Sequence, residues 1–79
     1  MSRDEVLKQI IEFAAMAFKT DAARIHEDTN IAEELGVASV QRVALSASIE
    51  NDFDVMIPVA RMGKFKTIGE LTDYVMDEM

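Results

Sequence analysis

Residues 34–40 read Glu-Leu-Gly-Val-Ala-Ser-Val and separate a short turn from a long helical pattern. Asn30 and Glu33 have the spacing to cap the short turn, and Gly36 is expected to end it in a left-handed conformation. Ser39 stands at the start of the next helix, where the first backbone N–H groups have no helical partners and carry partial positive charge. A phosphate joined to Ser39 would lie in a favourable field, although capping is the commonest role of a serine at such a position.

The N-terminal segment predicts a helix with one apolar face. Ser2 and Glu5 have the spacing of a capping box, in which a hydroxyl and a carboxylate each accept from the other residue's backbone N–H. Apolar residues then recur every three or four positions to about Lys19. Over residues 20–30 the apolar pattern thins, which predicts a long loop anchored by Ile25.

Two further helices and one short helix are expected in the rest of the chain. The second long pattern fades near Phe53, and its apolar stripe is predicted to be Val40, Val43, Ala44, Leu45, Ala47 and Ile49. Pro58 and Gly63 leave room for one or two helical turns between them. Thr67 and Glu70 have the spacing of a second capping box. The predicted fold is all-α: a small four-helix bundle with three main helices, one short helix and a long loop between the first two.

Composition excludes several classes of function. The 79 residues suffice for one small domain, and the absence of cysteine removes disulfides, thiolate zinc sites and thiol nucleophiles. A net charge of −7 disfavours binding to nucleic acid or anionic lipid. Apolar runs are far shorter than the ~20 residues of a membrane span, and His26 is expected to be solvated. We expect a cytoplasmic monomer with no metal site, no nucleic-acid partner and no membrane insertion.

The chain resembles the acyl carrier proteins, whose signature is a Gly-x-Asp-Ser-Leu loop in which the serine receives phosphopantetheine from coenzyme A. Here residues 36–40 read Gly-Val-Ala-Ser-Val. Further positions match the family's spacing over almost the whole chain: Leu35, Val43, Leu45, Ile49, Phe53, Ile57, Pro58 and Asp73-Tyr74-Val75. The resemblance implies a single acyl-carrier-like domain over residues 1–79, with no catalysis of its own. It also implies that 4'-phosphopantetheine on Ser39 holds an acyl group as a thioester.

The resemblance further implies a place for the acyl chain and a set of partners. In the family the chain can fold back between the helices, and the matching positions here are Ile49, Ile57, Met62, Phe65 and Leu71. Plain core packing is the other explanation of these residues. The implied partners are a phosphopantetheinyl transferase and an acyl-loading ligase, synthase or acyltransferase. Two alternatives stay open: an unmodified carrier-like module for protein interaction, and an aminoacyl or peptidyl carrier.

Two departures from the family pattern bear on modification and partner choice. Ala38 replaces the aspartate that precedes the serine and that helps the transferase dock in the family. Neutral or basic residues stand where common carriers present acids: Gln41, Arg42 and Ala44. Basic residues in and after the short helix extend this change: Arg61, Lys64 and Lys66. The predicted docking residues are Gln41, Arg42, Arg61 and Lys64. Because charge complementarity governs encounter and discrimination, this pattern predicts a specialised partner, in a secondary lipid or natural-product pathway.

Overall fold

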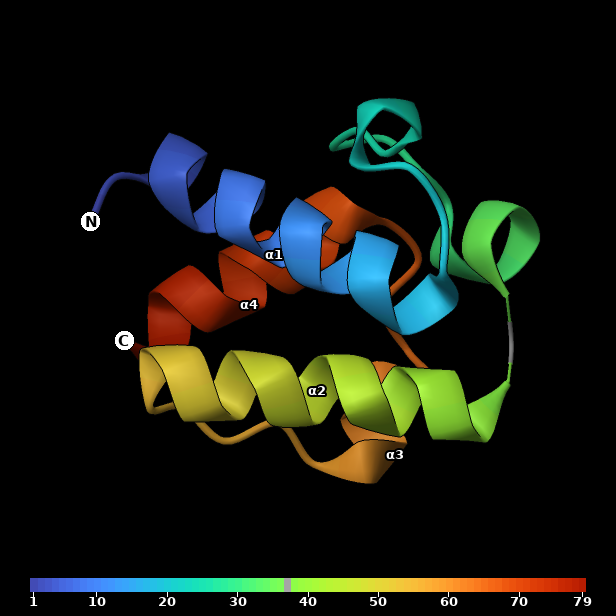
Figure 1. Cartoon of the computed structure of the whole chain (residues 1–79). Coiled ribbons are helices and arrows are strands. Elements are labelled where there is room, and N and C mark those ends of the chain that lie inside the picture. The colour runs from blue at the N-terminus through green and yellow to red at the C-terminus, as the bar shows by residue number, and fades with distance from the viewer. Residues whose placement is uncertain (37) are drawn as a thin grey trace.

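The computed structural model describes residues 1–36 and 38–79, with only the backbone of Val59 included. Its long helices are α1 (Arg3–Phe18), α2 (Ser39–Phe53) and α4 (Ile68–Glu78), and α3 (Val59–Met62) is short. A 3₁₀ turn, η1 (Ala22–Arg24), and a single π-helical turn, η2 (Ile31–Leu35), lie in the connection between α1 and α2. Helix α1 packs against both α2 and α4, and in the view of Figure 1 it runs above α2 and crosses α4. The predicted all-α bundle is confirmed.

The core forms where α1 meets α2 and α4. Helix α1 buries residues at four-residue steps, so one face of the helix is continuous core. Helix α2 adds Leu45 and Ile49 from the side facing α1. The fully or almost fully buried apolar side chains of α1 and α4 are Val6, Ile10, Ala14, Phe18, Ile68, Leu71 and Val75. Among the described residues, no helix has the length and apolar character needed to cross a membrane.

Capping differs between the two ends of the chain. At α1 the predicted box is confirmed: the Ser2 hydroxyl accepts from the Glu5 N–H at 3.3 Å, and the Glu5 carboxylate accepts from the Ser2 N–H at 2.9 Å. At α4 the Thr67 hydroxyl accepts from the Glu70 N–H at 3.1 Å. The Glu70 carboxylate, however, accepts from the Lys66 N–H at 3.3 Å rather than from Thr67. The second predicted box is therefore only half correct.

The long loop after α1 is fastened to the start of α4. The Gly69 N–H donates to the Glu27 carbonyl at 2.8 Å, and the Ile68 N–H donates to the Thr29 carbonyl at 3.1 Å. The Arg3 guanidinium also bridges the Glu27 carboxylate at 2.9 Å and the Asp73 carboxylate at 2.7 Å. Ile25 is 3% exposed, so its predicted role as the loop anchor is confirmed. These ties fix the loop that leads to η2 and then to Ser39.

The predicted apolar stripe of α2 is partly wrong. Leu45 and Ile49 are buried as expected, but Val40 is 81% exposed and Val43 is 46% exposed. Ala44 and Ala47 are exposed as well. The pattern contains two neighbouring rows at helical spacing, and α2 turns only the row that contains Leu45 and Ile49 toward α1. The other row forms an apolar solvent-facing surface.

Candidate functional site

Gly36 ends the η2 turn that precedes the site. Asn30 caps this turn as predicted, because its side-chain oxygen accepts from the Glu33 N–H at 2.9 Å. The Gly36 N–H donates to the Ile31 carbonyl at 2.8 Å. Gly36 has a positive φ of 145° with a ψ of 167°, so it is extended rather than in the left-handed helical conformation that we expected. Only glycine adopts this region readily, because a side chain there would strain the backbone.

Ser39 is the first residue of α2 and is exposed. The residue in the cap position is Ala38, and it makes no side-chain hydrogen bond. The capping interpretation of Ser39 is therefore wrong: its hydroxyl lies one position inside the cap, on the surface. Val37, the second residue of the Gly-Val-Ala-Ser-Val stretch, lies outside the described residues. The first turn of α2 contains no acid, so its backbone N–H groups face no competing carboxylate from that turn.

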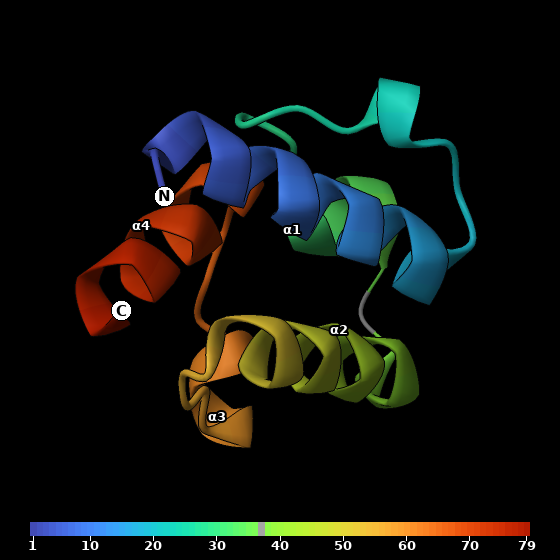
Figure 2. The ribbon, with the colours of Figure 1, turned by 60° about the vertical axis from the view of Figure 1, so that its left-hand side comes forward.

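A small cavity of about 110 Å³ lies next to Ser39, between α2 and α3. Figure 2 shows these two helices side by side. The lining residues are Ser39, Arg42, Val43, Ser46, Met62 and Gly63. The volume is below the ~150 Å³ of a cavity that holds benzene.

The sequence did not lead us to predict that two polar residues, Arg42 and Ser46, line one cavity together. The Ser46 side chain is buried and satisfied locally, because its hydroxyl donates to the Val43 carbonyl at 2.9 Å. The Arg42 Nε is buried, and it has no hydrogen-bond partner among the described residues. A recognisable signal was present, since Arg42 and Ser46 lie four positions apart and share a helical face with the apolar Ile49.

The five predicted acyl-pocket residues all belong to the buried core or pack against it. Only Met62 lines the cavity, and it is 3% exposed. Ile49, Ile57 and Leu71 belong to the buried core. Phe65 is half-buried and packs at a tilt on Tyr74, with ring centroids 5.3 Å apart. The contact of these residues with an acyl chain stays a prediction.

The four predicted docking residues do not form one uniform surface. Gln41 and Arg42 are half-buried, whereas Arg61 and Lys64 are exposed. The Arg61 guanidinium stacks on the Tyr74 ring at 5.1 Å from its centroid, so part of its role is packing within the chain. The exposed apolar row of α2 lies beside them and was not predicted as a docking surface. The exposure of Val40 and Val43, on a helix that begins at the site, reveals this surface in the structure.

The comparisons with known proteins agree with this geometry. The sequence profile of the family described as "Phosphopantetheine attachment site" matches residues 8–75. The chain therefore belongs to the phosphopantetheine-attachment family, whose acyl carrier members are carriers rather than catalysts. Members of this family receive the arm from a phosphopantetheinyl transferase and serve acyl-handling enzymes.

Similar curated proteins are named acyl carrier proteins. The chain is 25% identical over 76 residues to the mitochondrial acyl carrier protein 3 of Arabidopsis thaliana, which covers 96% of this chain and 58% of that protein. It is 27% identical over 71 residues to the acyl carrier protein of Porphyromonas gingivalis in two strains, with 90% of this chain and 91% of that protein covered. The chain thus spans little more than half of the plant relative and almost all of the bacterial one.

The residues present fit a phosphopantetheine arm. An exposed hydroxyl follows a glycine turn at a helix start, where backbone N–H groups favour a phosphate. Arg42 lines the adjoining cavity, and its Nε has no hydrogen-bond partner among the described residues. Its guanidinium can donate to an anionic oxygen. The arm supplies a thiol when it is attached, and the chain itself has no cysteine.

Proposed function

We propose that Ser39 carries the 4'-phosphopantetheine arm and that the chain presents an acyl thioester on it to enzymes of a specialised lipid or secondary-metabolite pathway. The observation that carries the attachment site is the exposed Ser39 hydroxyl at the first residue of α2, directly beyond the Gly36 turn. Transfer from coenzyme A joins this oxygen to phosphorus and releases the adenosine bisphosphate part as the leaving group. The Ser39 proton passes to a base of the transferase.

Attachment is tested by intact mass after incubation with coenzyme A and a transferase of broad specificity. The wild-type chain is expected to gain one phosphopantetheinyl mass, and Ser39→Ala is expected to gain none. Ser48→Ala is the matched control, because this half-buried serine lies on the same helix away from the cavity lining. It should be modified like the wild type. An adduct on Ser39→Ala, or none on the wild type, would show that the assignment is wrong.

The proposed partner surface is apolar and short of acids. Residues 35–49 contain no acidic side chain, and α2 exposes Val40, Val43, Ala44 and Ala47 there. Lys64 adds an exposed positive charge beyond α3. A partner that presents apolar or acidic groups complements this surface, whereas a strongly basic docking patch gains little from it. This contrast supports a dedicated ligase, synthase or acyltransferase as the partner.

Partner choice is tested by the triple variant Gln41→Glu, Ala44→Glu and Lys64→Glu. Arg42 and Arg61 are left unchanged because they line the cavity and stack on Tyr74, respectively. The variant should be used several-fold faster by a ketosynthase of ordinary fatty-acid synthesis, most clearly at low salt. The control Lys8→Glu with Arg24→Glu makes the same net charge change on other exposed residues. Equal use of wild type and triple variant would contradict the specialised-partner proposal.

The cargo is read from the mass of the protein purified from its own cells. An acyl group on the arm is expected. An unmodified chain would favour the interaction module, and an amino acid or peptide on the arm would favour the aminoacyl or peptidyl carrier. A cytoplasmic location and a monomeric state complete the proposal; size-exclusion chromatography with light scattering tests the second.

A further inference from the structure

Arg42 is the charged residue in the wall of the cavity beside Ser39. Its Nε is buried without a hydrogen-bond partner among the described residues, and both residues line the same cavity. One Arg42 terminal nitrogen lies 3.5 Å from the point that a Cβ on Gly63 would occupy. The guanidinium therefore reaches across from α2 to the end of α3, where the absence of a side chain leaves it room.

An unsatisfied guanidinium donor is costly in a folded protein. Buried polar atoms are normally hydrogen-bonded, and the Nε of the half-buried Arg42 is an exception among the described residues. Within the described part of the chain, both ion pairs belong to Arg3 and none to Arg42. The nearby stretch, residues 35–49, has no carboxylate. No carboxylate of the described residues pairs with Arg42, so its guanidinium is available to an anionic ligand.

We infer that Arg42 binds the phosphodiester of the arm on Ser39 and so directs the base of the arm toward the cavity between α2 and α3. This inference rests on the proposed attachment to Ser39. Residues three positions apart on a helix are neighbours, with Cβ atoms about 5–6 Å apart. The phosphorus is bonded directly to the Ser39 oxygen, so it lies within reach of Arg42 whatever cargo the arm carries. Guanidinium groups also bind phosphate oxygens through two N–H donors.

A carboxylate on the cargo is the competing anion, and position disfavours it. Such a group stands at the far end of the arm, and it reaches Arg42 only if the arm folds back. The phosphodiester is held at one end by Ser39 and meets the backbone N–H groups of the first turn of α2 as well. Arg42 is therefore a positioning residue, which sets the direction of the arm and takes no part in acyl transfer.

The direct test is NMR of the wild-type chain before and after modification. The Arg42 side-chain Nε–H signal should shift on attachment of the arm, and its exchange with water should slow about tenfold, the effect of one hydrogen bond to a charged group. The phosphorus signal of the modified Arg42→Gln variant should differ from that of the wild type. Arg42→Lys keeps the charge but lacks the Nε–H, and it should restore the phosphorus signal only in part.

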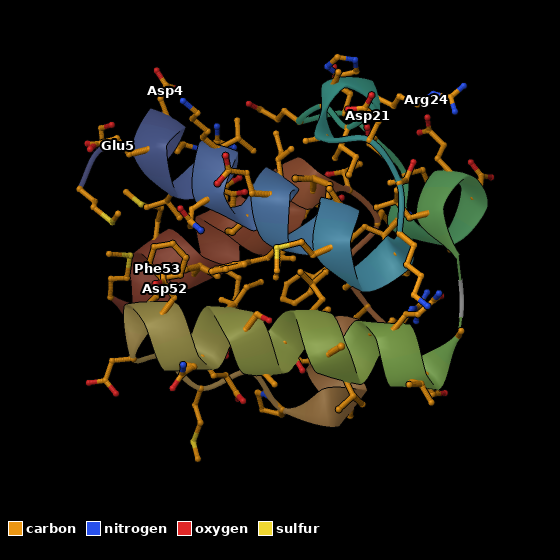
Figure 3. The ribbon with its side chains drawn as sticks, in the orientation of Figure 1. Asp4, Glu5, Asp21, Arg24, Asp52 and Phe53 are labelled. Atoms are coloured by element: carbon orange, nitrogen blue, oxygen red, sulfur yellow. The ribbon has the colours of Figure 1, made fainter. Side chains whose placement is uncertain are left out.

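The matched control is Arg24→Gln, because Arg24 is exposed on η1 and points away from the helices (Figure 3). Its phosphorus signal should equal that of the wild type. Three outcomes overturn the inference: an unchanged Arg42 Nε–H signal in the modified protein, a phosphorus signal insensitive to Arg42→Gln, or a response only when a dicarboxylic acyl group is loaded. Each leaves attachment to Ser39 intact, since the mass shift reports that separately. Because the first measurement uses the wild type, it stands even if a variant fails to fold.

Discussion

Two pairs of helices in this protein are built differently. Helices α1 and α4 begin with side-chain caps, and each buries one apolar face, on which Val6 of α1 is 0% exposed. Helices α2 and α3 begin without a side-chain cap, at Ala38 and Pro58. Val40 on α2 is 81% exposed, and the two helices line a cavity whose wall includes Arg42, the residue whose Nε has no partner in the described part of the chain.

This difference separates residues that stabilise the fold from residues that serve the site. The side-chain caps belong to α1 and α4, whereas the uncapped start, the exposed valines and Arg42 belong to α2, the helix that begins at Ser39. Such departures are expected at functional sites, because the groups that a ligand or partner will contact must be left available. The comparison predicts that substitutions in the α1–α4 pair change stability, whereas those near Ser39 change modification and recognition.

The largest expected effect contrasts two valines. Val6→Ala removes methyl groups from the core and should lower the free energy of unfolding by about 2–3 kcal/mol. Val40→Ala, the same change on an exposed helical position, should alter it by less than about 0.5 kcal/mol. Urea unfolding measures both. If the two variants lose similar stability, the row of α2 that contains Val40 is part of the core and the comparison fails.

Gly36 provides the next test, because it joins the two pairs of helices. Gly36→Ala places a side chain at φ 145° and should cost about 1–2 kcal/mol from backbone strain, although the nearest atom to the added carbon is 3.6 Å away. Gly63→Ala is the matched control, since Gly63 has φ −71° and its added carbon meets nothing closer than 3.5 Å. Thermal melting measures both variants. Equal losses in melting temperature would contradict the account.

Ala38→Asp should remove one of the departures near Ser39. A carboxylate in the cap position can accept from a free N–H of the first turn of α2, which should add about 1 kcal/mol of stability. A transferase that reads an acid before the serine should also modify the variant faster. Ala38→Leu cannot cap and serves as the control. Unchanged melting and unchanged modification kinetics would show that neither α2 nor the transferase uses a side chain at position 38.

The smallest effect concerns the cap of α1. The Ser2 backbone N–H and then the Ser2 hydroxyl lower the pKa of Glu5 below its usual value. Its folded pKa is thus below its unfolded pKa, so this contribution to stability is present above about pH 4.3 and is lost as the pH falls through the folded value. Glu5→Gln should make the acid side of the stability profile less steep. Glu12→Gln, farther along the same helix, should show less change if the cap is responsible.

The sequence was sufficient for the elements whose signals are local. The Ser2–Glu5 box, the Asn30 cap, the Ile25 anchor and the short helix between Pro58 and Gly63 were all predicted from neighbouring residues, and all are present. Periodicity could not decide which of two adjacent rows on α2 faces the core, because both contain apolar residues at helical spacing. That choice depends on packing against α1.

The candidate site was predicted in part for the same reason. Ser39 and Gly36 lie in one continuous stretch, so their relation was visible in the sequence. The cavity lies between α2 and two later residues, Met62 and Gly63, so it forms only when the connection between α2 and α3 folds back. The Arg42 Nε without a partner among the described residues is likewise evident only in the folded chain. The second capping box also depended on folding, since the Lys66 N–H takes the place of the expected donor.

The most direct test of the central claim is to locate the modification by peptide mapping. After incubation with coenzyme A and a transferase, trypsin should release residues 25–42, whose sole serine is Ser39, and residues 43–61, which contain Ser46 and Ser48. The account predicts that the phosphopantetheinyl mass is found on peptide 25–42 alone and that fragmentation assigns it to Ser39. A modified 43–61 peptide with an unmodified 25–42 peptide would contradict it.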